Sequence, residues 1–478
     1  MKKILSMILA VLLLLGLCAC GGAVSSNGDA NNGVQDTAGT FKVGFGREDI
    51  TPDFPVALSG GGDPNRIHTS VIDYIYTTCV AITDTTGKTV LVITSDLQSV
   101  ANSGSFNDGL RNAVSEATNV PAENILLCAT HNHSGPSQSE SKQGGTEFLK
   151  LFTERAVSAC KKAMDDRVPA TMAAGEIKAD GYVFPRHYKM MDGTYAGSSY
   201  GNLVVDQIES IAYEGDSTLQ MVQFVREGKK DVLMMNLGAH ATYFSSTSIT
   251  TLSSDFPGPL RQHIETNSDV LVAYFIGPAG DQTPSTKYKE KAHGLDHRQY
   301  GAAVGQLVVD ALPGLTAVNT GEINLQHMEH TGKTNYADVD RYVEAKEIYD
   351  IFLKDGYSKG NAAAKAAGFI SVYDARSIVT RSKLPKTQQI KLGALAIGDV
   401  SFIFASFEMF SETGRYIREN SPYGMTFICT LSLGSHDYIP SDIGFELNCY
   451  EAYTAHFEQD TAKNIADQYI ATLKDMKG

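Results

Sequence analysis

The sequence has few cysteines, and they are scattered. Only 7 of its 478 residues are Cys. Two of them, Cys18 and Cys20, lie in the apolar N-terminal segment, and the other five form no Cys-x-x-Cys pair: Cys79, Cys128, Cys160, Cys429 and Cys449. An odd and scattered set excludes a disulfide framework and a thiolate zinc site. Any metal bound by this chain must therefore be held by nitrogen and oxygen atoms.

The sequence also lacks an excess of basic residues. Its 40 Lys+Arg stand against 54 Asp+Glu, which gives a formal charge of 40 − 54 = −14. A protein that binds nucleic acid through the phosphates carries a basic stripe, so nucleic acid is excluded as a partner. The remaining composition, 42% hydrophobic and 20% charged, is that of a globular protein and excludes long disorder, collagen and coiled coil.

The N-terminal segment is basic and then apolar. Lys2 and Lys3 precede an apolar run over residues 4–17 that is too short for a comfortable membrane span. The run ends in Leu17-Cys18-Ala19-Cys20-Gly21, which resembles a bacterial lipobox. We therefore expect residues 1–19 to be a lipoprotein signal peptide and Cys20 to carry the lipid. The alternative is an ordinary secretory signal that is cleaved elsewhere.

Residues 20–40 are rich in Gly, Ser, Asn and Asp and have few large apolar side chains. Such a segment buries too little surface to order itself, so it is expected to be a flexible tether. The chain is then an exported lipoprotein anchored to the cell membrane through Cys20. The folded body is expected over residues 41–478, as one domain, because no internal repeat and no second linker is present.

Short apolar runs in this body end abruptly in polar residues. Runs of four to seven residues that are apolar on every side fit strands covered on both faces. They are residues 90–94, 125–128, 233–237, 270–276 and 400–405. Periods of 3.6 residues between them predict helices over 148–163, 299–312, 340–354 and 462–473. The sequence therefore predicts an α/β fold of mixed β-sheets flanked by helices.

The polar residues at the strand ends form a candidate site, because α/β folds place their chemistry there. They are His131, His133, His240, Asp281 and Glu408. The sharpest signal is His131-Asn132-His133, since two imidazoles at period two point to one side of an extended chain and reach a metal. Taken alone, such a pair is also compatible with two hydrogen-bonded structural histidines.

Several motifs, in order, resemble those of the neutral ceramidases in their large N-terminal catalytic domain. The resemblance covers about residues 41–457. Each motif is weak alone, and their shared order makes the resemblance strong. The motifs are Gly44-Phe45-Gly46-Arg47-Glu48-Asp49-Ile50-Thr51-Pro52, Thr130-His131-Asn132-His133-Ser134-Gly135-Pro136, Gly238-Ala239-His240-Ala241-Thr242, Ser254-Asp255-Phe256-Pro257-Gly258, Gly280-Asp281-Gln282-Thr283-Pro284, and the tyrosine pair Tyr438 and Tyr450.

The resemblance implies a zinc site and an amide-cleaving activity. The zinc ligands of the family fall on His131, His240, Glu408 and Tyr438, which leaves room for a water molecule that zinc activates. The residues around the metal fall on four other positions: His133, Tyr450, Arg186 and Thr283. Without the resemblance, Tyr438 would be taken for a half-buried aromatic residue and Glu408 for a solvated carboxylate at a helix start.

Two departures from the family pattern bear on mechanism. Ser406-Phe407-Glu408 stands where the family usually has Pro-Gly-Glu, and Thr283 stands where it has a serine. That serine is regarded as a nucleophile or as a hydroxyl that stabilises the transition state. The added methyl of Thr283 stiffens the side chain and crowds an attack, so the sequence favours direct attack by the activated water.

The resemblance therefore implies a zinc-dependent amidohydrolase that acts on ceramide or a related N-acyl lipid. Better-known ceramidases continue into a C-terminal β-sandwich domain, which is not expected in this chain. Three alternatives stay open: a hydrolase of a different small N-acyl substrate, a cell-surface binding lipoprotein on this scaffold, and a phosphate or sulfate ester hydrolase.

Overall fold

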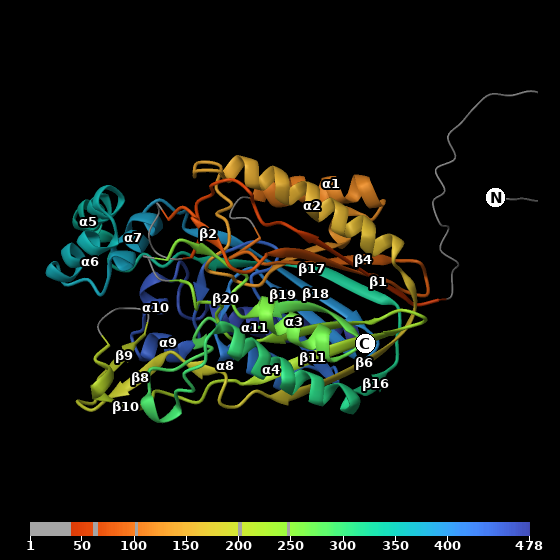
Figure 1. The fold of residues 1–478 in the computed structure, drawn as a ribbon. Coiled ribbons are helices and arrows are strands. Elements are labelled where there is room, and N and C mark those ends of the chain that lie inside the picture. The colour runs from red at the N-terminus through yellow and green to blue at the C-terminus, as the bar shows by residue number, and fades with distance from the viewer. Residues whose placement is uncertain (1–39, 61–65, 101–103, 199–202, 246–248) are drawn as a thin grey trace, which may run out of the picture. The chain divides into compact units, whose positions relative to one another are not determined.

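Two β-sheets packed face to face form the centre of the molecule (Figure 1). The computed structural model describes residues 40–478 except 61–65, 101–103, 199–202 and 246–248. The predicted signal peptide and all of the predicted tether but residue 40 lie outside the described residues. The described residues belong to one compact unit. No helix in the described part of the chain is long and apolar enough to span a bilayer.

The larger sheet has nine strands in the order β14-β12-β11-β6-β1-β3-β4-β5, with β16 also paired to β6. The pairs β4–β5 and β12–β14 are parallel and the others antiparallel, so the sheet is mixed. The strands are β1 (Lys42–Asp49), β3 (Tyr76–Thr83), β4 (Thr89–Ser95), β5 (Ile125–Ala129), β6 (Val168–Lys178), β11 (Thr218–Arg226), β12 (Asp231–Leu237), β14 (Val270–Ile276) and β16 (Thr316–Val318).

This sheet curls until its two ends meet. β14, at one end of the strand order, contacts β3, β4 and β5 at the other end. Thr94 Oγ1 in β4 donates a hydrogen bond to the carbonyl of Tyr274 in β14 (2.7 Å). Strand twist accumulates across a sheet of this size and makes such curling possible. The curl brings the carboxyl ends of β5 and β12 together, although five strands separate these two elements in the sheet order.

The smaller sheet has the order β17-β18-β19-β21 and covers the concave side of the larger one. Val92 and Phe275 from the larger sheet share a buried cluster with Phe402 and Phe427 from the smaller sheet. Burial on both faces explains why β4, β14, β19 and β21 are apolar on nearly every side. The strands are β17 (Ile323–Lys333), β18 (Thr387–Ile397), β19 (Val400–Ala405) and β21 (Met425–Cys429).

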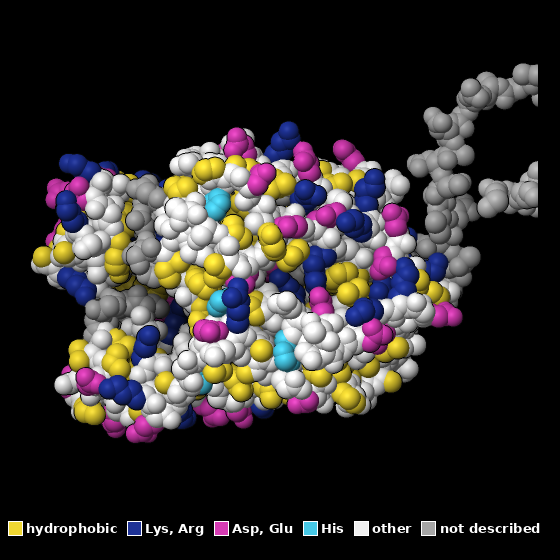
Figure 2. All heavy atoms as spheres, in the orientation of Figure 1, with side chains coloured by type: hydrophobic (Ala, Val, Ile, Leu, Met, Phe, Trp, Pro, Cys, Tyr) yellow, Lys and Arg dark blue, Asp and Glu magenta, His cyan; other side chains and the backbone are white. Residues whose placement is uncertain are grey.

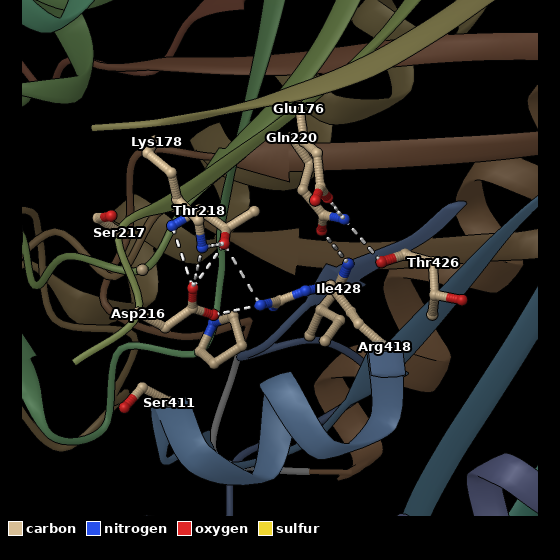
Figure 3. A network of polar contacts seen from close by, with 12 residues as sticks. Glu176, Lys178, Asp216, Ser217, Thr218, Gln220, Ser411, Arg418, Thr426 and Ile428 are labelled. Carbon is tan, nitrogen blue, oxygen red and sulfur yellow. Dashed lines mark hydrogen bonds and ion pairs between the residues drawn. The ribbon is translucent and has the colours of Figure 1, made fainter. Parts of the chain in front are cut away.

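Side-chain amides donate hydrogen bonds to backbone carbonyls along the outer edge of β21 (Figure 3). Gln220 in β11 donates to the carbonyl of Thr426 (2.9 Å). Asn236 in β12 donates to the carbonyl of Ile428 (2.8 Å). Arg418 and Lys178 both pair with Asp216 nearby. A buried strand edge with unpaired backbone groups would be costly. These amides therefore fix how the two sheets sit on each other.

Helices cover the outer faces of both sheets (Figure 1). α1 and α2 pack on the β3–β5 side of the larger sheet, α3 and α4 pack on β12 and β14, and α8 and α11 pack on the smaller sheet. The bounds are α1 (Gly104–Thr118), α2 (Gly145–Asp165), α3 (Pro257–Asn267), α4 (His297–Ala311), α8 (Ser411–Asn420) and α11 (Thr461–Lys477).

A lobe of three helices is inserted between β17 and β18, and it lies at one side of the molecule in Figure 1. The helices are α5 (Tyr342–Asp355), α6 (Tyr357–Ala366) and α7 (Val372–Arg381), and they share a small apolar core of their own. The remaining short elements are β2 (Ser70–Val71), β7 (Phe184–Pro185), β8 (His187–Met190), β9 (Tyr195–Gly197), β10 (Ile208–Ile211), β13 (Thr251–Leu252), β15 (Gln282–Thr283), β20 (Glu408–Met409), β22 (Tyr438–Ile439), α9 (Asp442–Glu446) and α10 (Tyr450–Thr454).

The predicted fold class is confirmed: the molecule has mixed sheets under helical layers. The five apolar runs form β4, β5, β12, β14 and β19, and the four helical periods fall within or overlap α2, α4, α5 and α11. All five cysteines of the described part are buried and unbridged. Acidic and basic side chains alternate over the face shown in Figure 2, and no broad basic stripe crosses that face.

The glycines of the first motif let α2 lie directly on β1. A Cβ atom added at Gly44 would lie 2.0 Å from the carbonyl oxygen of Ala163, and one added at Gly46 would lie 2.0 Å from that of Ala159. Both opposing atoms belong to helix backbone, which cannot swing away as a flexible side chain can. Glycine, whose side chain is a single hydrogen atom, is therefore required at these two positions for the helix to contact the sheet.

Gly46→Ala is expected to lower the free energy of unfolding by about 2 kcal/mol or more, because overpacking a close contact typically costs about 1–3 kcal/mol. Urea unfolding followed by circular dichroism measures the change. Gly109→Ala in α1 is the matched control, since an added Cβ there meets nothing within 4 Å. The control is expected to be as stable as the parent or slightly more stable. Equal stability of the two variants would contradict the proposed contact.

Candidate functional site

Four of the predicted site residues leave strand ends or short strands that the curled sheet brings together. His131 follows β5, and His240 follows β12. Glu408 begins β20 directly after β19, and Tyr438 begins β22. β20 and β22 pair in parallel with Glu408 opposite Tyr438. Because the larger sheet curls and the smaller sheet packs on it, these four residues from distant parts of the chain lie close together.

The segment that carries the two neighbouring histidines is a turn held by Asn132. His131 has a φ of 59°, so the segment is not the extended strand that the period-two argument assumed. The buried Asn132 amide donates to the carbonyls of Asp96 (3.1 Å) and Ser253 (2.7 Å), and its oxygen accepts from Ser134 N (3.0 Å). Both imidazoles still reach the same point, with their ring centroids 4.6 Å apart.

Each of the three imidazoles is anchored through Nδ1 to a backbone carbonyl. His131 Nδ1 lies 2.8 Å from the carbonyl of Gln98, and His133 Nδ1 lies 2.8 Å from that of Gly60. His240 Nδ1 lies 2.6 Å from the carbonyl of Ala279. Because a carbonyl oxygen only accepts, Nδ1 must carry the hydrogen in each ring. Nε2 of each neutral ring is then a bare lone pair.

These Nε2 atoms face one another and one carboxylate. His131 Nε2 and His133 Nε2 are 3.1 Å apart. Oε2 of Glu408 lies 3.0 Å from His240 Nε2 and 3.3 Å from His131 Nε2. The nitrogen atoms of the three imidazoles lie within 4.8 Å of one another. The arrangement gathers three nitrogen lone pairs and one carboxylate around a single point.

Electrostatics favour the neutral form of His133 and His240 and the charged form of Glu408. Burial lowers the pKa of His133 well below its usual value, and burial, aided by the charge of Arg186, lowers the pKa of His240 to about 4. Burial alone would raise the pKa of Glu408. The neighbouring side chains of His131 and His240 outweigh burial and hold that pKa well below its usual value.

This donor set fits a divalent metal ion. Two Nε2 lone pairs 3.1 Å apart repel each other unless a proton or a cation lies between them. Imidazole nitrogen and carboxylate oxygen are the ligands that catalytic zinc sites use, and the Nδ1 anchors are the outer hydrogen bonds that orient such ligands. The sequence prediction placed His133 outside the ligands, whereas the structure places its Nε2 beside that of His131.

Tyr438 and Arg186 lie in a buried polar network beside the imidazoles. Arg186 donates to the Tyr438 hydroxyl (3.0 Å) and to the carbonyl of Gly280 (2.7 Å), and it pairs with Glu451 (2.5 Å). The ring of Tyr438 stacks on that of His240, with the centroids 6.5 Å apart. Burial raises the pKa of the Tyr438 hydroxyl well above its usual value, although the charge of Arg186 opposes this rise.

Glu451 is a functional residue that the sequence reasoning missed. Its side chain is fully buried and binds Arg186 through one oxygen and His187 through the other (2.8 Å). Burial would raise its pKa, but Arg186 and His187 together hold that pKa far below its usual value. The available signal was its position beside Tyr450 in the tyrosine motif. A buried carboxylate is costly unless paired, so Glu451 holds the Arg186 guanidinium in place.

The site opens into a cavity of about 320 Å³. His131, His133, Glu408, Tyr438 and Tyr450 line it, while Arg186 and His240 are not among its lining residues. Tyr450 begins α10, and its ring lies 5.9 Å from that of Tyr438. The structure therefore brings five of the eight predicted site residues to one cavity and places two behind its wall.

Thr283 is not brought to this cavity. It is half-buried in β15, paired with Phe184 of β7, and it is not among the residues that line the cavity. Its neighbour Gln282 offers a backbone carbonyl 3.1 Å from His240 Nδ1. The segment thus supports His240 through its backbone, and a role for the Thr283 hydroxyl stays a prediction.

Other lining residues gave no sequence signal. They include Tyr373 and Arg376 from α7, Asp437 just before β22, and His456 just after α10. In the sequence, Arg376 belongs to the polar side of an amphipathic helix and was indistinguishable from a solvated surface residue.

The structure resembles solved ceramidase structures. It superposes on a ceramidase complexed with C2 with a TM-score of 0.65, over 92% of this chain and 75% of that chain, at 13% sequence identity. It superposes on the neutral ceramidase from Pseudomonas aeruginosa with a TM-score of 0.66, over 91% and 74% of the two chains, at 15% identity. No protein-family model matches the sequence, and no curated protein matches it. The chain therefore has the neutral ceramidase fold, as the motifs predicted.

Glu451→Gln is expected to destabilise the protein by about 3–5 kcal/mol at pH 7, because it leaves a buried guanidinium without its carboxylate. The pKa of Glu451 is lowered in the folded state. Its stabilisation is then fully present above the unfolded value near 4.3 and is lost as the pH falls below it. The stability difference between parent and variant should shrink between pH 7 and pH 3.

Thermal unfolding at several pH values measures this difference. Glu446→Gln, an exposed position in α9, is the control and should leave stability unchanged at every pH. A difference for Glu451→Gln that does not depend on pH would show that its charge is not what holds the network.

Proposed function

We propose that the protein is a zinc-dependent hydrolase that cleaves the amide bond of ceramide or of a related N-acyl compound. One observation carries the proposal: three imidazoles, two of them buried and that of His133 partly buried, turn their bare Nε2 atoms toward one another and toward the carboxylate of Glu408, at the end of a polar cavity. The similarity in fold to the neutral ceramidases supports amide hydrolysis as the reaction.

His131, His240 and Glu408 would hold the metal, and Tyr438 is the fourth ligand that the motif resemblance implies. His133, whose Nε2 lies beside that of His131, is a further nitrogen donor at the same point. A zinc ion in such a site lowers the pKa of water and polarises a carbonyl oxygen, which is the chemistry that amide hydrolysis requires. The Nδ1 anchors fix all three rings before any ion binds, so little reorganisation accompanies binding.

The other residues would bind and orient the substrate amide. The buried charge of Arg186, fixed by Glu451, lies against the Tyr438 hydroxyl and is positioned to stabilise negative charge that develops nearby. Tyr450 keeps its proton at neutral pH because burial raises its pKa, so it can donate a hydrogen bond to a substrate oxygen. Thr283 would contribute a hydroxyl and no covalent step.

We further propose that the chain is exported and attached to the cell membrane through a lipid on Cys20. The lipobox pattern Leu17-Cys18-Ala19-Cys20 supports this proposal. Acidic and basic side chains are mixed on the face shown in Figure 2, so this face has no basic patch with which to bind an anionic membrane. A lipid anchor would therefore be needed to hold the protein at the membrane.

Glu408→Gln is expected to abolish tight zinc binding and to lower the rate of amide hydrolysis by about a thousandfold or more, because it removes the single charged ligand. Thr283→Ala is expected to keep zinc and to lose about tenfold or less in rate, since a single hydrogen bond to the transition state is the most it removes. Zinc content after purification and release of fatty acid from N-acylsphingosines and short N-acyl amino acids, with and without chelator, measure both effects.

Glu419→Gln on the exposed side of α8 is the control and should match the parent. Complete loss of activity in Thr283→Ala with zinc retained would overturn the preference for direct attack by water. A zinc-loaded protein that releases fatty acid from neither substrate class would overturn the proposed function.

A further inference from the structure

One wall of the cavity is a single face of α7. The α7 residues that line the cavity are Tyr373, Arg376, Ser377 and Thr380, and this spacing places them on one side of a helix. The opposite side of α7 is apolar and packs against α5 through residues that include Ala375, Ile378 and Val379. The helix therefore presents its polar face to the cavity and its apolar face to the inserted lobe.

The connection between β17 and β18, which contains the lobe, is unusually long for two neighbouring antiparallel strands. β17 and β18 are direct antiparallel neighbours, a pair that two to five residues commonly join. Here residues 334–386, with three helices, make the connection. Ser377 Oγ donates to the carbonyl of Thr454 (3.1 Å), and the ring of Tyr373 meets that of Tyr450 edge-on, with the centroids 6.2 Å apart. These contacts dock α7 onto α10, so the insertion completes the cavity.

Among the described residues that line this cavity, Arg376 supplies the one guanidinium. The two carboxylates in that described lining have other partners: Glu408 faces His131 and His240, and Asp437 pairs with His456 at 3.5 Å. Among the described residues, no carboxylate lies within 4.0 Å of the Arg376 guanidinium, and the side chain is exposed. A guanidinium in a cavity without a protein partner offers two parallel N–H groups in the geometry that a carboxylate accepts.

The described part of the lining offers little apolar surface. Leu431 is the aliphatic side chain among these described lining residues, and most of the others are hydroxyl-bearing or charged. Sites for lipid-like ligands are lined mainly by apolar side chains. The two long chains of a ceramide would find little to bury against in this cavity, whereas a small anionic amide would meet polar groups and one free cation.

We propose that Arg376 binds the carboxylate of an N-acyl amino acid, so that the site takes acyl amino acids in preference to neutral ceramides. This inference rests on the proposed amide hydrolysis. Water then breaks the C–N bond: its hydroxyl goes to the acyl carbon and its proton to the nitrogen, which gives a fatty acid and a free amino acid without any redox partner.

The test compares two substrates that differ in one charge. N-hexanoylglycine carries the carboxylate, and N-hexanoylglycinamide has the same shape without it. The zinc-loaded protein should hydrolyse N-hexanoylglycine with at least about a tenfold higher kcat/KM, in the range expected for a charge-assisted pair. Arg376→Ala should lower that value by about tenfold to a hundredfold, mainly through KM, and leave the glycinamide unchanged. Arg376→Lys should restore part of the loss, and Arg155→Ala on α2 is the control that removes a distant exposed charge.

A second measurement separates binding from catalysis. In 4-oxononanoate a methylene replaces the amide nitrogen of N-hexanoylglycine, so it cannot be hydrolysed, and 4-oxononanamide is its neutral partner. Calorimetry on the zinc-loaded protein should show the same preference for the acid and its loss in Arg376→Ala. The preference in binding without hydrolysis of any amide would support the carboxylate site and overturn the proposed function.

Two other results would contradict the proposed role of Arg376. Hydrolysis of N-hexanoylsphingosine or the glycinamide at least as fast as N-hexanoylglycine, with Arg376→Ala affecting all substrates alike, would overturn the role of Arg376 and leave amide hydrolysis standing. Equal or absent binding of 4-oxononanoate and 4-oxononanamide would overturn the carboxylate site.

Discussion

The mutual repulsion of the three Nε2 lone pairs of His131, His133 and His240 decides what the site can bind. The Nδ1 atoms of His131, His133 and His240 each donate to a backbone carbonyl, so three bare Nε2 atoms crowd one buried point beside an ionised carboxylate. Such a cluster is unfavourable without a cation. The curl of the nine-stranded sheet and the cover of the smaller sheet create the cluster, because they bring strand ends from opposite ends of the sheet together.

Two supporting layers give the cluster its chemical setting. Behind it, Glu451 fixes Arg186, and Arg186 fixes the Tyr438 hydroxyl, so a buried positive charge is held beside the imidazoles. In front of it, α7 closes the cavity and adds a free cation from an inserted lobe. The scaffold is shared with solved ceramidase structures. The lining of the cavity is where a preference for one N-acyl compound over another would be built.

The sequence predicted those features that are local in the chain. Fully apolar runs ending in His131, His240 and Glu408 were recognisable as strand ends, and β5, β12 and β19 lie there. The curl of the sheet was not predictable, since it depends on twist summed over many strands. Glu451 and Arg376 were missed for a similar reason: each is polar on a short helix, and only tertiary packing makes one a buried partner of Arg186 and the other a cavity residue. The spacing of His131 and His133 predicted an extended segment, whereas the structure has a turn there. This turn was not predictable, because Asn132 holds it through hydrogen bonds to residues far away in the sequence.

The inward Nε2 atoms and Glu408 are proposed to bind a zinc ion, and anomalous diffraction at the zinc edge from crystals of the purified protein shows whether they do. We expect one strong peak about 2.0–2.2 Å from the Nε2 atoms of His131 and His240 and from a Glu408 oxygen, the distances typical of zinc with nitrogen and oxygen ligands. A zinc-replete crystal with no peak at this point, or with its peak at a cysteine, would rule out this metal site.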